Sequence, residues 1–122
     1  MTDSASDSFA QLRVEIQQLR SRHQALVRER PETVELATHW TFAAGVLRWH
    51  VAVEDVDEPD IDIEVLADLI VVRAQRHARR RELLLGLLPV PAEFARARAL
   101  FRYENGYLEI SLASRGGEAG RR

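Results

Sequence analysis

The chain of 122 residues contains no cysteine, and all of its 17 Lys and Arg residues are arginine. Without cysteine, disulfide bonds, thiolate nucleophiles and cysteine-based metal sites are excluded, and the redox compartment is left undefined. No apolar run approaches the roughly 20 residues that cross a bilayer. The N-terminal sequence MTDSASDSF is acidic and polar, unlike a signal peptide. We therefore expect a cytoplasmic protein that binds no membrane.

Sequence signatures of catalysis are also missing. The chain has no Gly-x-Ser-x-Gly, no His-Glu-x-x-His and no phosphate-binding loop. His39 and His50 could face each other across a hairpin, but two histidines without a third ligand make a poor zinc site. The acidic segment 54–64 lacks the spacing of a calcium-binding EF-hand. These absences argue against an enzyme, and we expect no cofactor and no metal ion.

The charge of the chain gives little indication of a partner. A net charge of −2 provides no general attraction to nucleic acid or to anionic lipid. Arginines cluster between Arg76 and Arg81, but no aromatic residues flank them, so we expect no nucleic-acid binding. A solvated hairpin tip is the simplest interpretation of this cluster, and an acidic partner is the alternative.

The first part of the chain carries a helical pattern. Its apolar residues recur in steps of three and four when His23 is included, which is the a/d spacing of a coiled coil. The apolar members of this stripe are Phe9, Leu12, Ile16, Leu19 and Leu26. Ser8 could begin a capping box, and Pro31 disfavours a helical residue before it. We expect a helix from about Phe9 to Glu29, within an N-terminal region of residues 1–31.

The stripe on this helix is narrow, and its other faces are charged. A narrow stripe suits another helix better than a broad sheet. The favoured interpretation is a short coiled coil between subunits, which would make the protein a homo-oligomer, namely a dimer through the N-terminal helix. The alternative is a single helix that folds back on its own domain.

Short β-strands are expected in the rest of the chain. Asn105-Gly106 is the strongest hairpin signal, because both central positions of a type I′ turn need positive φ. Further strands are predicted at 33–42, 46–53, 61–65 and 69–74. The apolar segment 82–90 is ambiguous between strand and helix, and its Gly86 and Pro89 favour a strand or an irregular segment. Many short strands separated by turn signals predict an all-β fold, here a two-sheet antiparallel β-sandwich of about seven strands. We assign this sandwich to residues 32–113, after one N-terminal α-helix and before a disordered tail at 114–122.

Several of these segments resemble the α-crystallin domain of small heat-shock proteins. Residues 103–108 (YENGYL) are similar to the Tyr-x-Asn-Gly-Val-Leu hairpin that ends this domain, and Val90-Pro91 stands where the family has Leu-Pro. Residues 60–65 (DIDIEV) and the apolar strand at 69–76 resemble the middle of the domain. The resemblance covers about residues 34–113. It implies an α-crystallin, CS-like sandwich and an ATP-independent holdase chaperone that binds non-native proteins.

Two assembly devices of that family are absent from the sequence. Only residues 76–82 separate two strands between which bacterial members carry a long excursion that is swapped into a neighbouring subunit. The tail after Ala113 lacks the Ile-x-Ile motif that docks on the next dimer. We therefore expect no strand-swapped dimer of that type. CS domains share the sandwich without the swap loop, and the alternative function is a non-chaperone interaction module that docks one specific partner.

Apolar surfaces are the expected functional sites. Capture of unfolding chains requires exposed hydrophobic patches, and burial of apolar area is not directional. The candidates for client or subunit contact lie on the helix and on the leucine-rich strand, and they are Phe9, Leu12, Ile16, Leu19, Leu26, Leu83, Leu84, Leu85 and Leu87. The alternative is that these side chains are buried in the core or in a subunit interface.

Overall fold

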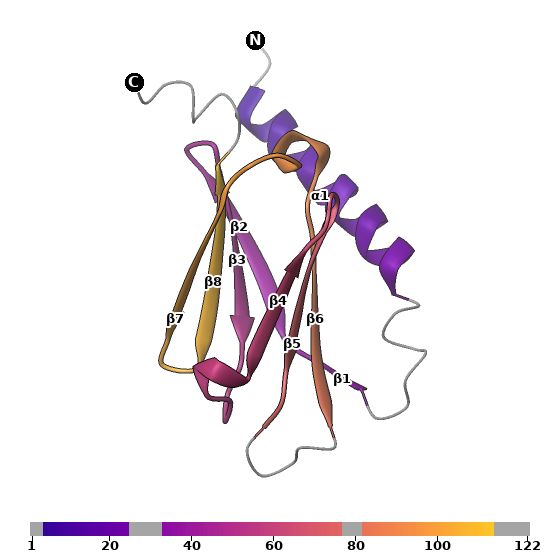
Figure 1. The fold of residues 1–122 in the computed structure, drawn as a ribbon. Helices are drawn as coiled ribbons and strands as arrows, with labels where there is room; N and C mark the ends of the chain where they lie inside the picture. Colours follow the sequence, from indigo (N-terminus) through magenta and orange to yellow (C-terminus); the bar gives the residue numbers. More distant parts are fainter. Residues whose placement is uncertain (1–3, 25–32, 77–81, 114–122) are drawn as a thin grey trace.

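The computed structural model describes residues 4–24, 33–76 and 82–113, which form one α-helix and two stacked four-stranded sheets (Figure 1). The elements are α1 (Ser4–His23), β1 (Thr33–Glu35), β2 (Thr38–Ala43), β3 (Val46–Ala52), η1 (Glu58–Asp60), β4 (Ile61–Val65), β5 (Leu69–Ala74), β6 (Leu83–Pro89), η2 (Ala92–Phe94), β7 (Ala99–Glu104) and β8 (Tyr107–Ala113). Sheet A has the strand order β1-β6-β5-β4, and sheet B has the order β2-β3-β8-β7. All strand pairs are antiparallel except β1 with β6. The predicted two-sheet sandwich with one N-terminal helix is confirmed.

The core lies between the two sheets and follows the alternation of the sequence. In β3, Leu47, Trp49 and Val51 are fully buried, whereas the residues between them are partly exposed. In β8, Leu108, Ile110 and Leu112 are buried in the same way. Successive side chains of a strand point to opposite faces, so these residues line the inner face of sheet B.

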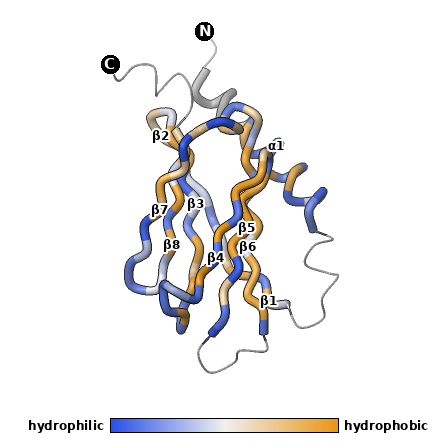
Figure 2. The backbone as a smooth tube through the Cα atoms, in the orientation of Figure 1, coloured by the Kyte–Doolittle hydropathy of each residue, from blue (hydrophilic) through white to orange (hydrophobic). Residues whose placement is uncertain are grey.

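Two strands of sheet A, β5 and β6, are buried on both of their faces. Ile70 and Val72 of β5 belong to the main core, whereas the alternating residues Leu69 and Val71 form a second buried cluster with Leu85 and Leu87 of β6. Figure 2 shows hydrophobic residues running almost continuously along β5 and β6. Such runs are typical of strands that are covered on both sides.

The Asn105-Gly106 hairpin turn has the backbone conformation that its sequence predicts, and the turn between β2 and β3 has a similar one. Asn105 and Gly106 have φ angles of 52° and 79°. Ala44 and Gly45, in the turn between β2 and β3, have φ angles of 53° and 76°. Positive φ at both central positions defines a type I′ turn, whose twist matches that of the flanking strands.

The single strand predicted at 33–42 is wrong, because the structure divides it between the two sheets. The Leu36 backbone N–H donates to the Leu85 carbonyl at 2.9 Å, in sheet A. One residue later, the Ala37 carbonyl accepts a hydrogen bond from the Ala52 N–H at 3.0 Å, at the end of β3 in sheet B. Leu36 is buried in the core. The chain therefore crosses from one sheet to the other at this point, which local strand propensity cannot reveal.

The predicted start of the helix is also wrong. Helix α1 begins at Ser4, so Ser8 lies within the helix and is not its cap. The segment from Ser4 to Ser8 contains no proline or glycine that would stop the helix. The helix is described up to His23. The predicted extension to Glu29, including Leu26, lies outside the described residues, as does the tail at 114–122.

Candidate binding surfaces around the N-terminal helix

Helix α1 folds back on its own sandwich. It lies on the side of the molecule where β6 runs, and β7 lies on the opposite side (Figure 1). Leu12 and Ile16 are each 3% exposed and belong to the core cluster that both sheets share. While α1 is docked in this way, these side chains cannot form the seam of a coiled coil between subunits. The alternative interpretation of the stripe, a helix folded on its own domain, is the one that the structure shows.

The position of α1 explains why a narrow apolar stripe is enough for the helix to pack on the sandwich. Strand β1 pairs with Leu83–Leu85 of β6, and in the part of the chain that the structure describes no strand lies beside the remainder of β6 on that side. On the other sheet β2 is the border strand, and Arg20 Nη2 of α1 donates to Thr38 Oγ1 of β2 at 3.3 Å. The helix therefore closes one open side of the sandwich, between β2 and β6, where a single row of apolar side chains reaches the core.

Both tryptophans of the chain contact α1. The rings of Phe9 and Trp40 have centroids 5.2 Å apart. The Arg20 guanidinium lies over the ring of Trp49, 5.8 Å from its centroid, a distance typical of a cation–π contact. Trp49 is fully buried, and its Nε1–H donates to the Pro89 carbonyl at 3.1 Å, which ties β3 to β6.

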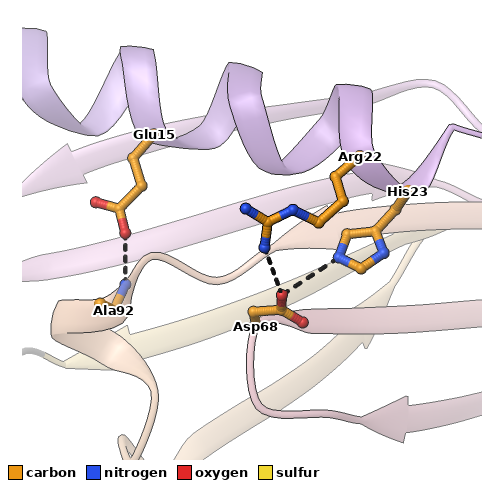
Figure 3. Close-up of polar contacts among 5 residues, drawn as sticks. All are labelled: Glu15, Arg22, His23, Asp68 and Ala92. Carbon is orange, nitrogen blue, oxygen red and sulfur yellow. Dashed lines mark hydrogen bonds and ion pairs between the residues drawn. The ribbon is translucent and has the colours of Figure 1, made fainter.

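Polar contacts hold α1 to two loops of the sandwich (Figure 3). Glu15 Oε2 accepts a hydrogen bond from the Ala92 N–H at 2.7 Å. Asp68 Oδ2 lies 3.6 Å from Arg22 Nη1 and 3.4 Å from His23 Nε2. The Arg22 and Asp68 side chains are 67% and 41% exposed, so solvent screens this ion pair. His23 Nε2 is buried without a hydrogen-bond partner, and its approach to Asp68 is an ion pair only when the imidazole is protonated.

A groove of about 870 Å³ opens beside the helix. Val14 and Leu19 line it from α1, and Ala67, Val90 and Ala95 line it from the loops that follow β4 and β6. The walls of the groove are therefore largely apolar, although side chains of α1 that make polar contacts with the loops also line it. The helix meets these loops incompletely, which leaves an opening between the two.

The leucines predicted as contact residues are mostly buried within the chain. Leu84 is fully buried in the main core, and Leu85 and Leu87 belong to the second buried cluster. Leu83 is half-buried. Leu85 and Leu87 are buried because they pack with Leu69 and Val71 of the neighbouring strand β5. These side chains are not on a free surface of this chain, and their contact with a client or a subunit stays a prediction.

Several exposed apolar residues were not singled out by sequence reasoning. They are Val34, Val65, Leu66, Leu100, Phe101 and Tyr107, together with Val14 of α1, and among the predicted contact residues that the structure describes only Phe9 is similarly exposed. Phe101 alternates with Tyr103 in the sequence and should face a core. It is 48% exposed because β7 borders sheet B. The order of the strands decides this exposure, and no local sequence signal reports it.

The histidine pair has the predicted arrangement across the β2–β3 hairpin. His39 and His50 are register partners, and their rings stack with centroids 4.6 Å apart. Glu109 Oε2 lies 3.9 Å from His50 Nδ1. Within residues 4–24, 33–76 and 82–113, no group of three or more His, Cys, Asp or Glu side chains is placed to hold a metal ion. Nor is any helix in these ranges long and apolar enough to span a membrane.

Most of the arginine cluster lies outside the described residues, at 77–81. Its first member, Arg76, donates from Nη1 to Glu82 Oε1 at 3.4 Å. This contact joins the two residues that flank segment 77–81, and it pairs one arginine of the cluster with a carboxylate.

The two-sheet arrangement, with its terminal Asn-Gly hairpin, is that of the α-crystallin domain. No protein-family model matches the sequence, and a comparison with curated proteins finds no match. Among solved structures, however, the chain is similar to small heat-shock proteins, and the resemblance seen in the sequence is confirmed at the level of the fold.

Three of these structures illustrate the likeness. HSP18.5 from E. histolytica has a TM-score of 0.59 and 13% identity, over 66% of this chain and 88% of that one. A deletion mutant of hsp14.1 from Sulfolobus solfataricus P2 has a TM-score of 0.59 and 19% identity, over 83% of this chain and 98% of that one. The hspA protein from Xanthomonas axonopodis has a TM-score of 0.57 and 12% identity, over 67% of this chain and 95% of that one. The chain therefore has the fold of small heat-shock proteins.

Proposed function

We propose that this protein is an ATP-independent chaperone that holds non-native proteins through apolar surfaces. The observation that carries the proposal is the fold, which the chain shares with heat-shock proteins from a protist, an archaeon and a bacterium. The proposal includes action in the cytoplasm and assembly into a homo-oligomer, and it assigns no catalytic step to the protein.

The exposed apolar residues support this function. Leu100 and Phe101 are neighbours on β7, the border strand of sheet B, and Val65 ends β4, the border strand of sheet A, with Leu66 directly after it, so both border strands present apolar side chains. Exposed patches of this kind mark interaction sites, and their non-directional attraction suits partners that differ in sequence. Phe9 adds an exposed aromatic ring on α1.

Suppression of aggregation tests the proposal directly. A heat-labile test enzyme is warmed without nucleotide, with and without an equimolar amount of this protein, and light scattering is followed. We expect scattering to fall several-fold, and an unrelated protein of similar size to have no effect. Phe101→Ser should weaken suppression, whereas Arg102→Ser, on the same strand and also exposed, should not. An unchanged scattering curve with the wild-type protein would refute the chaperone function.

The oligomeric state is measured separately, by size-exclusion chromatography with light scattering on the full chain. A mass of two or more chains supports the proposed assembly, and a monomer over the whole concentration range contradicts it. Because the apolar stripe of α1 is buried in its own sandwich, the mass alone does not identify the interface.

A further inference from the structure

Helix α1 is held to the sandwich by contacts of its side chains, whereas the strands of each sheet are joined by backbone hydrogen bonds. Three of its apolar side chains, Leu12, Ile16 and Leu19, are buried. Its polar contacts join exposed or partly exposed side chains, as at Asp68 and Glu15. Surface contacts of this kind contribute little to stability in water. A single helix that has left its tertiary contacts is itself only marginally stable. α1 is therefore the element best placed to open without unfolding the two sheets.

The face beneath α1 is already shaped for a helix. Leu12 and Ile16, at positions i and i+4 of α1, enter the main core there, and Leu19 at i+7 is also buried. The face also presents Trp40 to the ring of Phe9 and Trp49 to the guanidinium of Arg20. Tryptophan provides a large apolar area together with a preference for cations over its ring face. An amphipathic segment with the same spacing and a basic flank would make equivalent contacts.

We infer that the face between β2 and β6 is a binding surface for amphipathic helical segments of non-native proteins, and that α1 occupies it when no client is present. This inference rests on the proposed chaperone function and names the surface through which it acts. The client segment replaces α1, inserts its aliphatic side chains at the positions of Leu12 and Ile16, and covers both tryptophans.

The groove beside α1 provides the place where exchange begins. It lies between the helix and the loops that carry Asp68 and Ala92, and apolar residues line both of its walls. A client side chain can enter there while Leu12 and Ile16 are still buried. Each polar contact that breaks as the helix moves away leaves exposed groups that water can satisfy, as at Asp68.

A reversible crosslink tests whether α1 must leave. Gln18 and Ala95 line opposite walls of the groove, on α1 and on the loop after η2. The chain contains no cysteine, so a Gln18→Cys/Ala95→Cys variant has only these two thiols. A short bismaleimide with a reducible spacer joins them and fixes α1 to the sandwich. The matched control is Asp62→Cys/Arg73→Cys, whose positions are register partners on β4 and β5 and whose crosslink leaves α1 free.

Two readouts are measured on each full-length variant before and after reduction. The first is suppression of the aggregation of a heat-labile enzyme. The second is fluorescence anisotropy of a labelled peptide with the sequence of residues 4–24, which is a probe for the vacated face. We expect the α1 crosslink to reduce suppression at least fivefold and peptide affinity at least tenfold. Reduction should restore both, and the control crosslink should change neither.

The outcomes separate the inference from the proposed function. If the crosslinked protein binds the peptide and suppresses aggregation as well as the reduced protein does, the inference is wrong. Crosslinking between two chains, seen as a dimer on a denaturing gel, would show that α1 of a second copy occupies the face, and would also overturn it. If only the reduced protein binds the peptide but neither form suppresses aggregation, the surface stands and the chaperone function fails.

Discussion

Paired truncations of the buried stripe on α1 should destabilise the protein by less than the sum of their separate effects. Leu12 and Leu19 are 3% and 7% exposed. Truncation of a buried leucine to alanine costs about 2–5 kcal/mol of unfolding free energy. If the two sites acted independently, Leu12→Ala/Leu19→Ala would therefore cost about 4–10 kcal/mol. The two residues are seven positions apart, about 10 Å along the helix, so direct coupling between them is small.

The free energy of unfolding that these truncations remove is limited by the energy with which α1 docks on the sandwich. Burial of Leu12, Ile16 and Leu19 stabilises the docked helix by about 4.5–9 kcal/mol before the entropy of ordering the helix is subtracted. Once a truncation has removed most of the net docking energy, α1 detaches. A second truncation on a detached helix then has no further effect on the sandwich. We expect the double variant to cost at least 1 kcal/mol less than the sum of the single variants, a difference of the size measured for coupled sites.

Urea unfolding measures these energies, with tryptophan fluorescence and far-UV circular dichroism recorded on the same samples. Both tryptophans contact α1, so fluorescence in the double variant should report the detached helix before the sheets unfold. Val14→Ala, on the exposed face of α1, should change stability by less than about 0.5 kcal/mol. Leu69→Ala/Ile110→Ala, in two separate buried clusters, should be additive. Full additivity of the α1 pair, with coincident fluorescence and dichroism transitions, would refute a separately docking helix.

Three further substitutions test the sandwich by thermal denaturation. Gly86→Ala should leave stability unchanged or raise it by about 0.5–1 kcal/mol, because the new Cβ would lie at ordinary contact distances of 3.5–3.6 Å and φ is not positive; a loss above about 1 kcal/mol would contradict this packing. Asn105→Ala should cost about 1–2 kcal/mol through its φ of 52°, whereas Asn105→Gly should be tolerated, and equal effects of the two would contradict the turn assignment. Tyr103→Phe removes the hydroxyl that donates to the Val56 carbonyl at 2.6 Å, and should cost about 0.5–1.5 kcal/mol. Tyr107→Phe, at an exposed position, should cost less, and the reverse order would contradict that bond.

The sheets could be predicted from sequence because the information that specifies them is local. Alternation in β3 and β8 assigns each side chain to a face, and the Asn-Gly pair fixes the hairpin that joins β7 to β8. The facing of His39 and His50 follows from the turn between β2 and β3 in the same way. In each case residues close in sequence determine the contact.

The features that could not be predicted depend on the order of the strands. The exposure of Phe101 arises because β7 borders sheet B, and the burial of Leu85 and Leu87 arises because β6 lies beside β5, where they pack with Leu69 and Val71. The split between β1 and β2 is of the same kind, because the chain changes sheets where Leu36 enters the core. The residue types at these positions do not by themselves reveal whether the side chain is buried or exposed.

The apolar stripe of α1 shows why the candidate surface itself was missed. A spacing of three and four residues specifies one narrow contact line, and a partner helix or a gap between two sheets can equally provide it. The deciding feature lies elsewhere in the chain, in strand β1, which is three residues long and pairs with the first part of β6. Among the described residues no strand therefore fills the side of the sandwich between β2 and β6. Leu12 and Ile16 close that opening in place of a longer strand. A helix can leave such a position without breaking any strand pairing, which a longer β1 could not do.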